Sequence, residues 1–423
     1  MSWHEAHPLL FVNAFAAGHH EGAWRMPEAE PQRLREIGYY QELARTAELG
    51  GFDALFVADF FAYYPGIAHS PRWELDPLTV LAAAAAVTET LGLIATASAI
   101  FSPAMEIARA FSTLDHVSGG RAAWNIVTSG EPRAAANYGL DRVPPHAERY
   151  AQTAAVVQDV LALWRADGGE ADMPAPLQPR PVLVQAGSSP EGRDFAVRHA
   201  DIVFTAQGTL ASAQAFRADL HGRARALGRT SLPRVVVGLS PSIGASRAEA
   251  LRKKAELDAL IVPEASLAWL EGFGIDLSGH ALDGPLPPQL AGEGAAFEGI
   301  RSRLGVIAEV IARERPRTVR DLLARLAGSR GHASVAGTPE DIARHIHEWH
   351  GAGAADGFML MPHLLPRDLT DFVDQVVPLL GLPPPPQGKT LSERLGLSLG
   401  PRASAGPRHT QVFSVSSTQG RQP

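Results

Sequence analysis

Cysteine is absent from all 423 residues of the chain. Its absence excludes disulfide bonds, thiolate metal sites, iron–sulfur clusters and a cysteine nucleophile. An excess of charge of one sign is also missing, because 38 Lys and Arg residues face 45 Asp and Glu residues, for a net charge of −7. This mildly acidic balance, without a basic run, argues against nucleic acid or an anionic membrane as the main partner.

Long uninterrupted hydrophobic runs are missing as well. Residues 1–5 lack the basic start and the apolar stretch of a signal peptide. The most apolar stretch, residues 77–105, is divided by Thr88, Glu89 and Gly92, so we expect a buried alanine-rich helix followed by a buried strand, not a membrane span. Because 45% of the residues are apolar, the chain can bury a large core. The expectation is a globular cytoplasmic protein.

Short apolar runs alternate with helical segments, which is the order typical of a parallel sheet. Eight runs are predicted as strands: residues 9–12, 53–58, 91–98, 121–127, 181–185, 201–204, 234–239 and 357–361. Eight such alternations predict an α/β fold, a (β/α)8 TIM barrel. An open, doubly wound sheet is the alternative, disfavoured because no G-x-G-x-x-G follows the first strand.

The seventh and eighth predicted strands are separated by far more chain than an ordinary connection needs. We interpret residues 241–355 as an insertion over the barrel mouth, with helices near 248–261 and 300–313. The barrel domain with its insertion is expected to span residues 1–382. Residues 383–423 begin with four prolines and continue rich in Ser and Gly, which predicts a disordered tail.

Polar residues cluster where the predicted strands end, which is where parallel barrels build their active sites. They are Asn13, His19, His20 and Trp24 after the first strand, Asp59 after the second, Thr96 and Ser98 in the third, Asn125 in the fourth, and Ser188 and Ser189 after the fifth. Asp59 could instead cap a turn. The Asn125 amide, inside an apolar strand, needs a polar partner, which is either a structural network or a ligand.

Two further patterns suit a phosphate without requiring one. Residues 186–190, with small side chains before a proline, predict a helix start whose free N–H groups and dipole favour an anion, although many helices begin this way without a ligand. His146 and Tyr150 are four residues apart, so they share one side of a helix start, where surface capping is the alternative.

A resident metal and a protein nucleophile are not indicated. His345, His347 and His350 are spaced so that a helix scatters them, which favours a solvated face over a metal site. The chain also lacks a G-x-S-x-G elbow and a Walker lysine. A polar barrel mouth without such groups suggests that a cofactor performs the chemistry.

The segment Trp124-Asn125-Ile126-Val127-Thr128-Ser129, with residues 114–123 before it, resembles the bacterial-luciferase-like flavin monooxygenases. The resemblance is to the branch of nitrilotriacetate, EDTA and dibenzothiophene-sulfone monooxygenases, and it covers residues 8–380. Supporting matches occur at residues 20–25, 94–98, 181–189, 204–207, 276–279, 328–332 and 354–358.

The resemblance implies a luciferase-like TIM barrel that uses reduced FMN (FMNH2) delivered by a separate NAD(P)H:flavin reductase. It implies that O2 forms a flavin peroxide, which inserts one oxygen atom into a small organic substrate. A homodimer is also expected, from the resemblance and from the apolar helix at residues 78–87.

The same resemblance implies roles for particular residues. The residues that match the family's flavin contacts are Asp59, Thr96, Ser98, Asn125, His146, Tyr150, Ser188 and Ser189. Asp59 and Asn125 would face the ring, and Tyr150 and the two serines would lie toward the ribityl phosphate. His20 and Trp24 match positions beside the reacting edge, so with Asn125 they are the expected catalytic residues.

One departure from the family puts the substrate class in doubt, because the connection between Trp164 and Pro181 is shorter than family members usually have. Two alternatives therefore stay open. One is an oxidoreductase of the same superfamily that uses the deazaflavin F420, and the other is a flavin-binding protein without catalytic activity.

Overall fold

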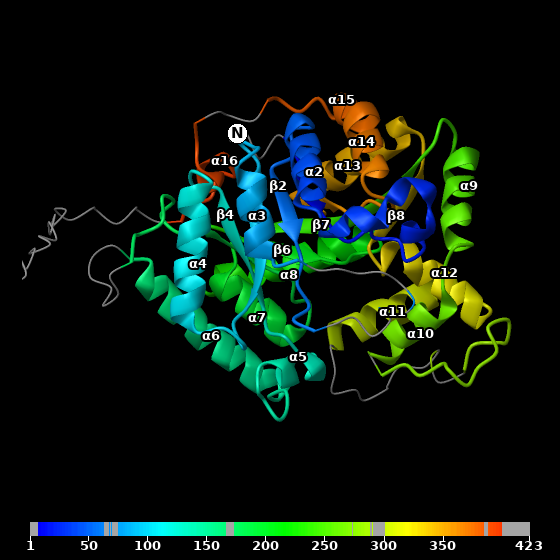
Figure 1. The fold of residues 1–423 in the computed structure, drawn as a ribbon, viewed down its shortest axis with the longest axis horizontal. Coiled ribbons are helices and arrows are strands. Elements are labelled where there is room, and N and C mark those ends of the chain that lie inside the picture. The colour runs from blue at the N-terminus through cyan, green and yellow to red at the C-terminus, as the bar shows by residue number, and fades with distance from the viewer. Residues whose placement is uncertain are drawn as a thin grey trace, which may run out of the picture.

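Eight parallel strands close into a barrel (Figure 1). The computed structural model describes residues 7–62, 67, 69, 75–165, 173–272, 274–287, 290, 301–384 and 388–399. The barrel strands are β1 (Leu9–Asn13), β2 (Ala54–Val57), β3 (Gly92–Ser98), β4 (Ala122–Val127), β5 (Val182–Gln185), β6 (Ile202–Thr205), β7 (Arg234–Ile243) and β9 (Gly357–Leu360). Pairing of β6 with β7 and of β1 with β9 closes the ring. The predicted TIM barrel is confirmed, and the open sheet is excluded.

Helices between the strands cover the outside of the barrel. They are α2 (Ile37–Leu49), α3 (Pro77–Ala85), α4 (Ala104–Val117), α6 (His146–Leu163), α7 (Pro190–His199), α8 (Leu210–Ala226) and α13 (Pro339–Gly351). The alanine-rich segment forms the expected helix and strand: Asp76 caps α3 by accepting a hydrogen bond from the Thr79 N–H at 2.7 Å, and β3 follows. Among the described residues, no helix combines the length and apolarity needed to span a membrane.

Successive side chains along each strand point to opposite faces of the sheet, so they belong alternately to the core inside the barrel and to the core beneath the helices. Phe11, Ile94 and Met359 belong to the cluster that fills the barrel, whereas their strand neighbours pack outward against the helices. At the carboxyl ends of β1, β3 and β4 the inward positions become polar. The inside of the barrel is therefore filled with apolar side chains, and the polar carboxyl ends of the strands form the mouth of the barrel.

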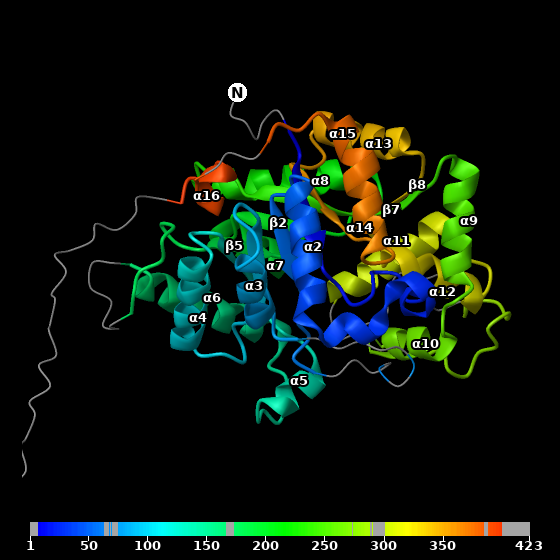
Figure 2. The same ribbon diagram turned by 45° about the horizontal axis from the view of Figure 1, so that its top comes forward.

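The chain between β7 and β9 carries an unpredicted strand. β8 (Ala333–Gly337) pairs in parallel with the part of β7 from Leu239 to Ile243, because β7 extends beyond its predicted end. This segment also contains α9 (Arg247–Asp258), α10 (Pro263–Glu271), α11 (Arg301–Glu314) and α12 (Val319–Ser329). Helices α10 to α12 share a separate hydrophobic cluster beside the barrel (Figure 2).

The opposite end of the barrel is covered by residues 388–399, which we name the base segment. It contains the short helix α16 (Leu391–Arg394). Leu391 and Leu395 are 1% and 0% exposed and belong to the cluster inside the barrel. The Ser392 N–H donates to the Gln178 side-chain oxygen at 2.9 Å, and the Gln178 amide donates to Asp115 at 2.7 Å. The predicted disorder is therefore wrong for residues 388–399, while residues 400–423 lie outside the described residues.

The base segment also places a charge below the barrel. Arg394 is 2% exposed, and its positive charge acts on the buried carboxylate of Asp53. Burial raises the pKa of Asp53 to about 6, although a hydrogen bond from the Leu10 N–H and the charge of Arg394 act in the opposite direction. Electrostatic attraction and apolar burial therefore both hold the base segment.

Replacing the buried leucine of the base segment tests its contribution to stability. Leu395→Ala should lower the free energy of unfolding by about 2–4 kcal/mol, the range for a fully buried leucine. Leu379→Ala, at a leucine that is 43% exposed, is the matched control and should change it by less than about 1 kcal/mol. Urea denaturation measures both variants, and equal stabilities would contradict a structural role for the segment.

Candidate active site

The mouth of the barrel begins with a chain of hydrogen bonds across three strands. The Asn125 amide on β4 donates to the Thr96 hydroxyl on β3 at 3.0 Å, and that hydroxyl donates to the Val57 carbonyl on β2 at 2.9 Å. Asn125 and Thr96 are neighbours in the strand register and are 5% and 3% exposed. This bond uses one of the amide's hydrogens, so its second N–H and its oxygen retain capacity for a ligand.

Neighbouring polar groups extend this surface. The side-chain oxygen of Asn13, at the end of β1, is buried and has no hydrogen-bond partner among the described residues. The Ser98 hydroxyl accepts from Ser129 at 2.8 Å, which fixes the loop after β4. Asp59 is half-buried, and burial raises the pKa of its carboxyl group. Hydrogen bonds from the Phe61 and Phe60 N–H groups act to lower this pKa but have the smaller effect. An unsatisfied buried amide oxygen costs free energy, so Asn13 indicates that a donor from a ligand belongs here.

A second group of predicted residues surrounds the start of α7. The Ser189 hydroxyl caps the helix by accepting from the Gly192 N–H at 3.1 Å. The Tyr150 hydroxyl hydrogen-bonds to Ser189 and Thr128. These bonds act to lower its pKa, but burial has the larger effect, so the pKa is raised. A Cβ atom at Gly187 or Gly192 would come within about 3 Å of the Tyr150 hydroxyl, so glycine at both positions lets the backbone approach closely. We name Tyr150, Gly187, Ser188, Ser189 and Gly192 the helix cradle.

His146 lies at the edge of the helix cradle. Its ring centroid is 5.1 Å from that of Tyr150, and its Nδ1 is 3.8 Å from a Glu191 carboxylate oxygen. Ser188 is partly exposed, and its carbonyl accepts from Arg193 at 2.9 Å, which leaves its hydroxyl outside this bond. The structure therefore brings the predicted phosphate-binding residues together at one helix N-terminus.

His20 is buried and engaged at both ring nitrogens. Nδ1 accepts from the Gly22 N–H at 3.0 Å, so Nε2 carries the proton that it donates to Asp258 at 3.0 Å. Burial alone would raise the pKa of Asp258, but the hydrogen bond from His20 and the charge of Lys254 together lower it. A direct catalytic role for His20 would require one of these bonds to break, so the geometry favours a positioning role.

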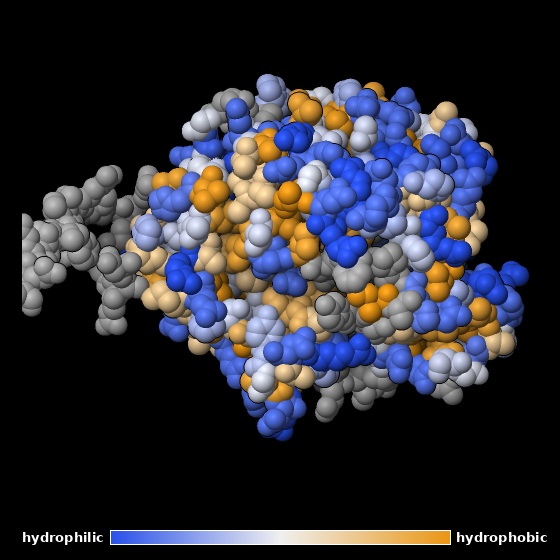
Figure 3. All heavy atoms as spheres, in the orientation of Figure 1, coloured by the Kyte–Doolittle hydropathy of each residue, from blue (hydrophilic) through white to orange (hydrophobic). Residues whose placement is uncertain are grey.

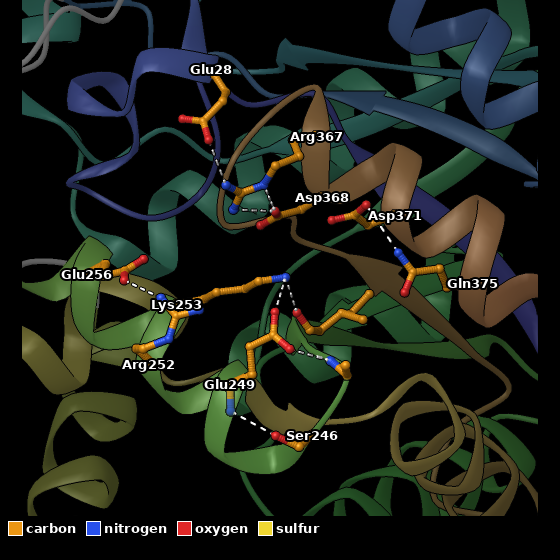
Figure 4. Close-up of polar contacts among 12 residues, drawn as sticks. Glu28, Ser246, Glu249, Arg252, Lys253, Glu256, Arg367, Asp368, Asp371 and Gln375 are labelled. Carbon is orange, nitrogen blue, oxygen red and sulfur yellow. Dashed lines mark hydrogen bonds and ion pairs between the residues drawn. The ribbon is translucent and has the colours of Figure 1, made fainter.

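Helix α9, which carries Asp258, is held against the end of β7 by Lys253 (Figure 4). Lys253 donates to the Ile243 carbonyl at the end of β7 at 3.1 Å and pairs with Glu249 at 3.4 Å. Arg367 begins α14 (Arg367–Asp371), which follows β9, and pairs with Asp368 at 3.0 Å and with Glu28 at 3.4 Å. The pair of Arg367 with Glu28 joins the segment after β9 to the loop after β1, and the bond from His20 to Asp258 joins that loop to α9.

Trp24 takes no direct part in the polar network just described. It lies in a short 3-10 helix, η1 (Ala23–Arg25), and packs half-buried against the main core. Its indole N–H is buried without a hydrogen-bond partner among the described residues. The expected role of Trp24 beside a reacting edge remains a prediction.

The chain between β7 and β9 supplies mouth residues to which sequence analysis assigned no role. The His332 ring stacks on Phe204 at the end of β6, with centroids 5.2 Å apart. A Cβ atom at Gly238 would clash with this ring, so glycine on β7 makes room for it. Gly331 has a φ of +88°, and a side chain there would clash with Val306. The glycine spacing at residues 328–332 was the available signal for this turn.

His19 and Arg330 complete this side of the mouth. The His19 ring lies 5.9 Å from that of His332, and burial, followed by the charge of Arg330, holds the pKa of His19 well below its usual value. The Arg330 guanidinium lies over Phe15 at 5.2 Å and Trp269 at 5.5 Å, and it is 3.6 Å from Glu21. The mouth therefore combines a neutral histidine with aromatic and cationic groups.

The residues present fit an FMN molecule. The helix cradle offers hydroxyl donors and a helix N-terminus to a phosphate. Asn13, Asp59 and Asn125 offer acceptors and donors to a polar ring edge. In the described part of the chain, no three His, Asp or Glu side chains converge closely enough to hold a metal ion.

Comparisons with known proteins identify the family of the chain. Residues 12–356 match the family model described as luciferase-like monooxygenase. The chain is 37% identical to nitrilotriacetate monooxygenase component A of Aminobacter aminovorans, with 90% of this chain and 94% of the relative covered. EDTA monooxygenase from Chelativorans sp. BNC1 superposes with a TM-score of 0.77 and 28% identity, covering 95% of this chain and all of that one.

A third similar protein is a riboflavin lyase solved with modified FMN and riboflavin, with a TM-score of 0.79 and 27% identity over 92% of this chain and 96% of that one. The resemblance to the nitrilotriacetate and EDTA monooxygenases and the expectation of a flavin-dependent monooxygenase enzyme are confirmed. The chain belongs to the luciferase-like monooxygenase family.

Proposed function

We propose that the protein binds reduced FMN without a covalent link and inserts one atom of O2 into a small organic substrate. Bound reduced FMN supplies two electrons and two protons, so that one oxygen atom enters the substrate, the other leaves as water and FMN is released oxidised. The observation that carries the proposal is the pairing of the helix cradle with the polar ends of β1, β3 and β4 around one mouth.

The protein's own groups would bind and orient the cofactor. Tyr150, Ser188 and Ser189 would donate to the ribityl phosphate, and the α7 N-terminus would stabilise its charge. Asn125 and Asn13 would hydrogen-bond to the ring edge, and Asp59 would accept from a ring N–H. The substrate would enter between the ring and the side chains brought by the chain between β7 and β9.

That side of the mouth would also exclude water. Phe15 is 8% exposed and Trp269 is also 8% exposed, and the buried Arg330 lies over both rings. A reactive intermediate is protected from hydrolysis when the active site excludes water. The neutral His19 would therefore act in a site of low dielectric constant, beside the ring of His332.

Turnover with a separate reductase tests the reaction. With an NADH:FMN reductase, NADH, FMN and catalase, substrate-dependent O2 uptake is expected over a panel of sulfones, aminopolycarboxylates and alkanes. With 18O2, the product should carry one labelled oxygen atom. Omission of FMN is the control and should abolish product.

Other results would assign a different activity. Reduced FMN that binds without product on any panel member would indicate a flavin-binding protein without catalysis. Product formed only when reduced F420 replaces reduced FMN, without oxygen incorporation, would indicate a deazaflavin oxidoreductase.

Asn125→Leu tests whether the amide meets the flavin. The side chains are similar in volume, so removal of one buried hydrogen bond to the ring should weaken reduced-FMN binding about tenfold or more, which is about 1.4 kcal/mol. Anaerobic fluorescence titration of the folded protein measures the affinity. If the amide only ties strands together, the melting temperature should fall while the affinity stays unchanged.

The control for this variant is Thr96→Val. It removes the hydroxyl that joins Asn125 to the Val57 carbonyl but keeps the amide itself. We expect a lower melting temperature and a smaller loss of affinity than for Asn125→Leu. Equal losses of affinity in the two variants would locate the effect in the strand network.

We also propose a homodimer whose interface includes α3. Figure 3 shows hydrophobic side chains gathered over the face that carries this helix. Leu78, Ala82 and Ala83 are partly exposed on α3, and Met105 at the start of α4 is 44% exposed. Exposed apolar surface of this kind is stabilised by a partner.

Light scattering at micromolar protein should return twice the chain mass of 45.0 kDa. Leu78→Glu would bury a charge in the interface, so this variant should return the mass of one chain. Leu379→Glu, at an exposed leucine of another helix, should keep the dimer. A single-chain mass for the unaltered protein would contradict the proposal.

A further inference from the structure

A cavity of about 620 Å3 lies at the amino-terminal end of the barrel, and we name it the base cavity. Its walls come from α8 and the following loop, the first residue of β7, the residues before β9 and the residues after α16. The part of β7 within the barrel, residues 234–239, spans about 17 Å at 3.3 Å per residue. The base cavity is therefore separate from the mouth, at the other end of the strands.

Positive charge in the base cavity exceeds negative charge. Arg217, Arg225 and Arg234 line it, and Asp356 is its one acidic lining residue. Asp356 is already used, because it pairs with Arg217 at 2.8 Å and accepts from the Val235 N–H at 2.7 Å. The Arg225 and Arg234 side chains form no ion pair or hydrogen bond with the residues that the structure describes. Two guanidinium groups are therefore left to an external anion.

Two histidines also line the walls, and each is engaged in a hydrogen bond with a backbone carbonyl. His221 is bonded through Nε2 to the Pro233 carbonyl at 3.0 Å, and burial lowers its pKa. His350 is bonded through Nδ1 to the Ala355 carbonyl at 3.2 Å. The permanent positive charge in the walls that is not paired with Asp356 is that of Arg225 and Arg234.

The other groups that line the base cavity indicate what else the ligand should contain. Thr230 and Ser231 add hydroxyl groups beside the arginines, which suits the several acceptor oxygens of a phosphate. Leu232, Pro233 and Leu397 add apolar surface. The volume falls within the range of sites for small molecules, about 300–1,000 Å3.

We propose that the base cavity binds a phosphorylated small molecule of nucleotide size, with its phosphate on Arg225 and Arg234 and its apolar body against Leu232 and Leu397. Because Leu397 follows α16, such a ligand contacts the base segment directly. A ligand that binds only the folded chain stabilises it by mass action. Binding at the base therefore raises the melting temperature of the barrel without occupying the mouth.

Calorimetric titration of the full chain at low ionic strength tests the proposal, with ADP, inorganic pyrophosphate and adenosine as probes. ADP is expected to bind saturably and to raise the melting temperature, and adenosine should bind at least tenfold more weakly. Arg225→Gln/Arg234→Gln should weaken ADP binding at least tenfold. Arg109→Gln/Arg198→Gln, which removes two exposed arginines from α4 and α7, is the matched control and should bind as the unaltered protein does.

Thermal unfolding without ligand checks that the variants fold. A second test is Thr230→Glu, at an exposed loop position, which places a negative charge in the cavity. This variant should also lose ADP binding. Absence of saturable binding, or equal affinity in the double variant and its control, would overturn the proposal. Sedimentation with anionic phospholipid vesicles without binding of soluble phosphates would overturn it as well.

Discussion

Closure of a parallel sheet is the constraint on which the rest of the molecule depends. Hydrogen bonds between β6 and β7 and between β1 and β9 leave no free edge in the ring. Because all eight strands run the same way, every carboxyl end reaches the mouth and every amino end reaches the base. The mouth is polar and collects the predicted flavin contacts. The base is sealed by apolar side chains from a distant part of the chain.

The residues that the ring itself brings together could be predicted from the sequence. Apolar runs identified the eight barrel strands, and the two-residue spacing placed Thr96 and Ser98 on one face of β3. The start of α7 was also predictable, because Ser189 precedes Pro190 directly after a strand. Local pattern was enough in these cases, since each residue's position follows from its own strand or helix.

Features that depend on distant partners could not be predicted in this way. β8 contains Ser334, which is exposed, and Val335 and Ala336, which are only partly buried, so its sequence lacks the apolar run of a barrel strand. The base segment follows four prolines and reads as a tail, yet Leu391 and Leu395 are buried by strands far away in the sequence. His20 bonds to Asp258 across 238 residues, a contact that no local pattern encodes. His332 reaches the mouth only through the turn that precedes β8.

The position of the base segment in the sequence has a consequence for folding during synthesis. All barrel strands leave the ribosome before residues 388–399 do, because these residues lie beyond β9. Until they emerge, the apolar interior of the nascent barrel faces water at its base, and surfaces of this kind recruit chaperones. A chain that stopped before residue 388 would keep every barrel strand but would leave the apolar base of the barrel exposed to water.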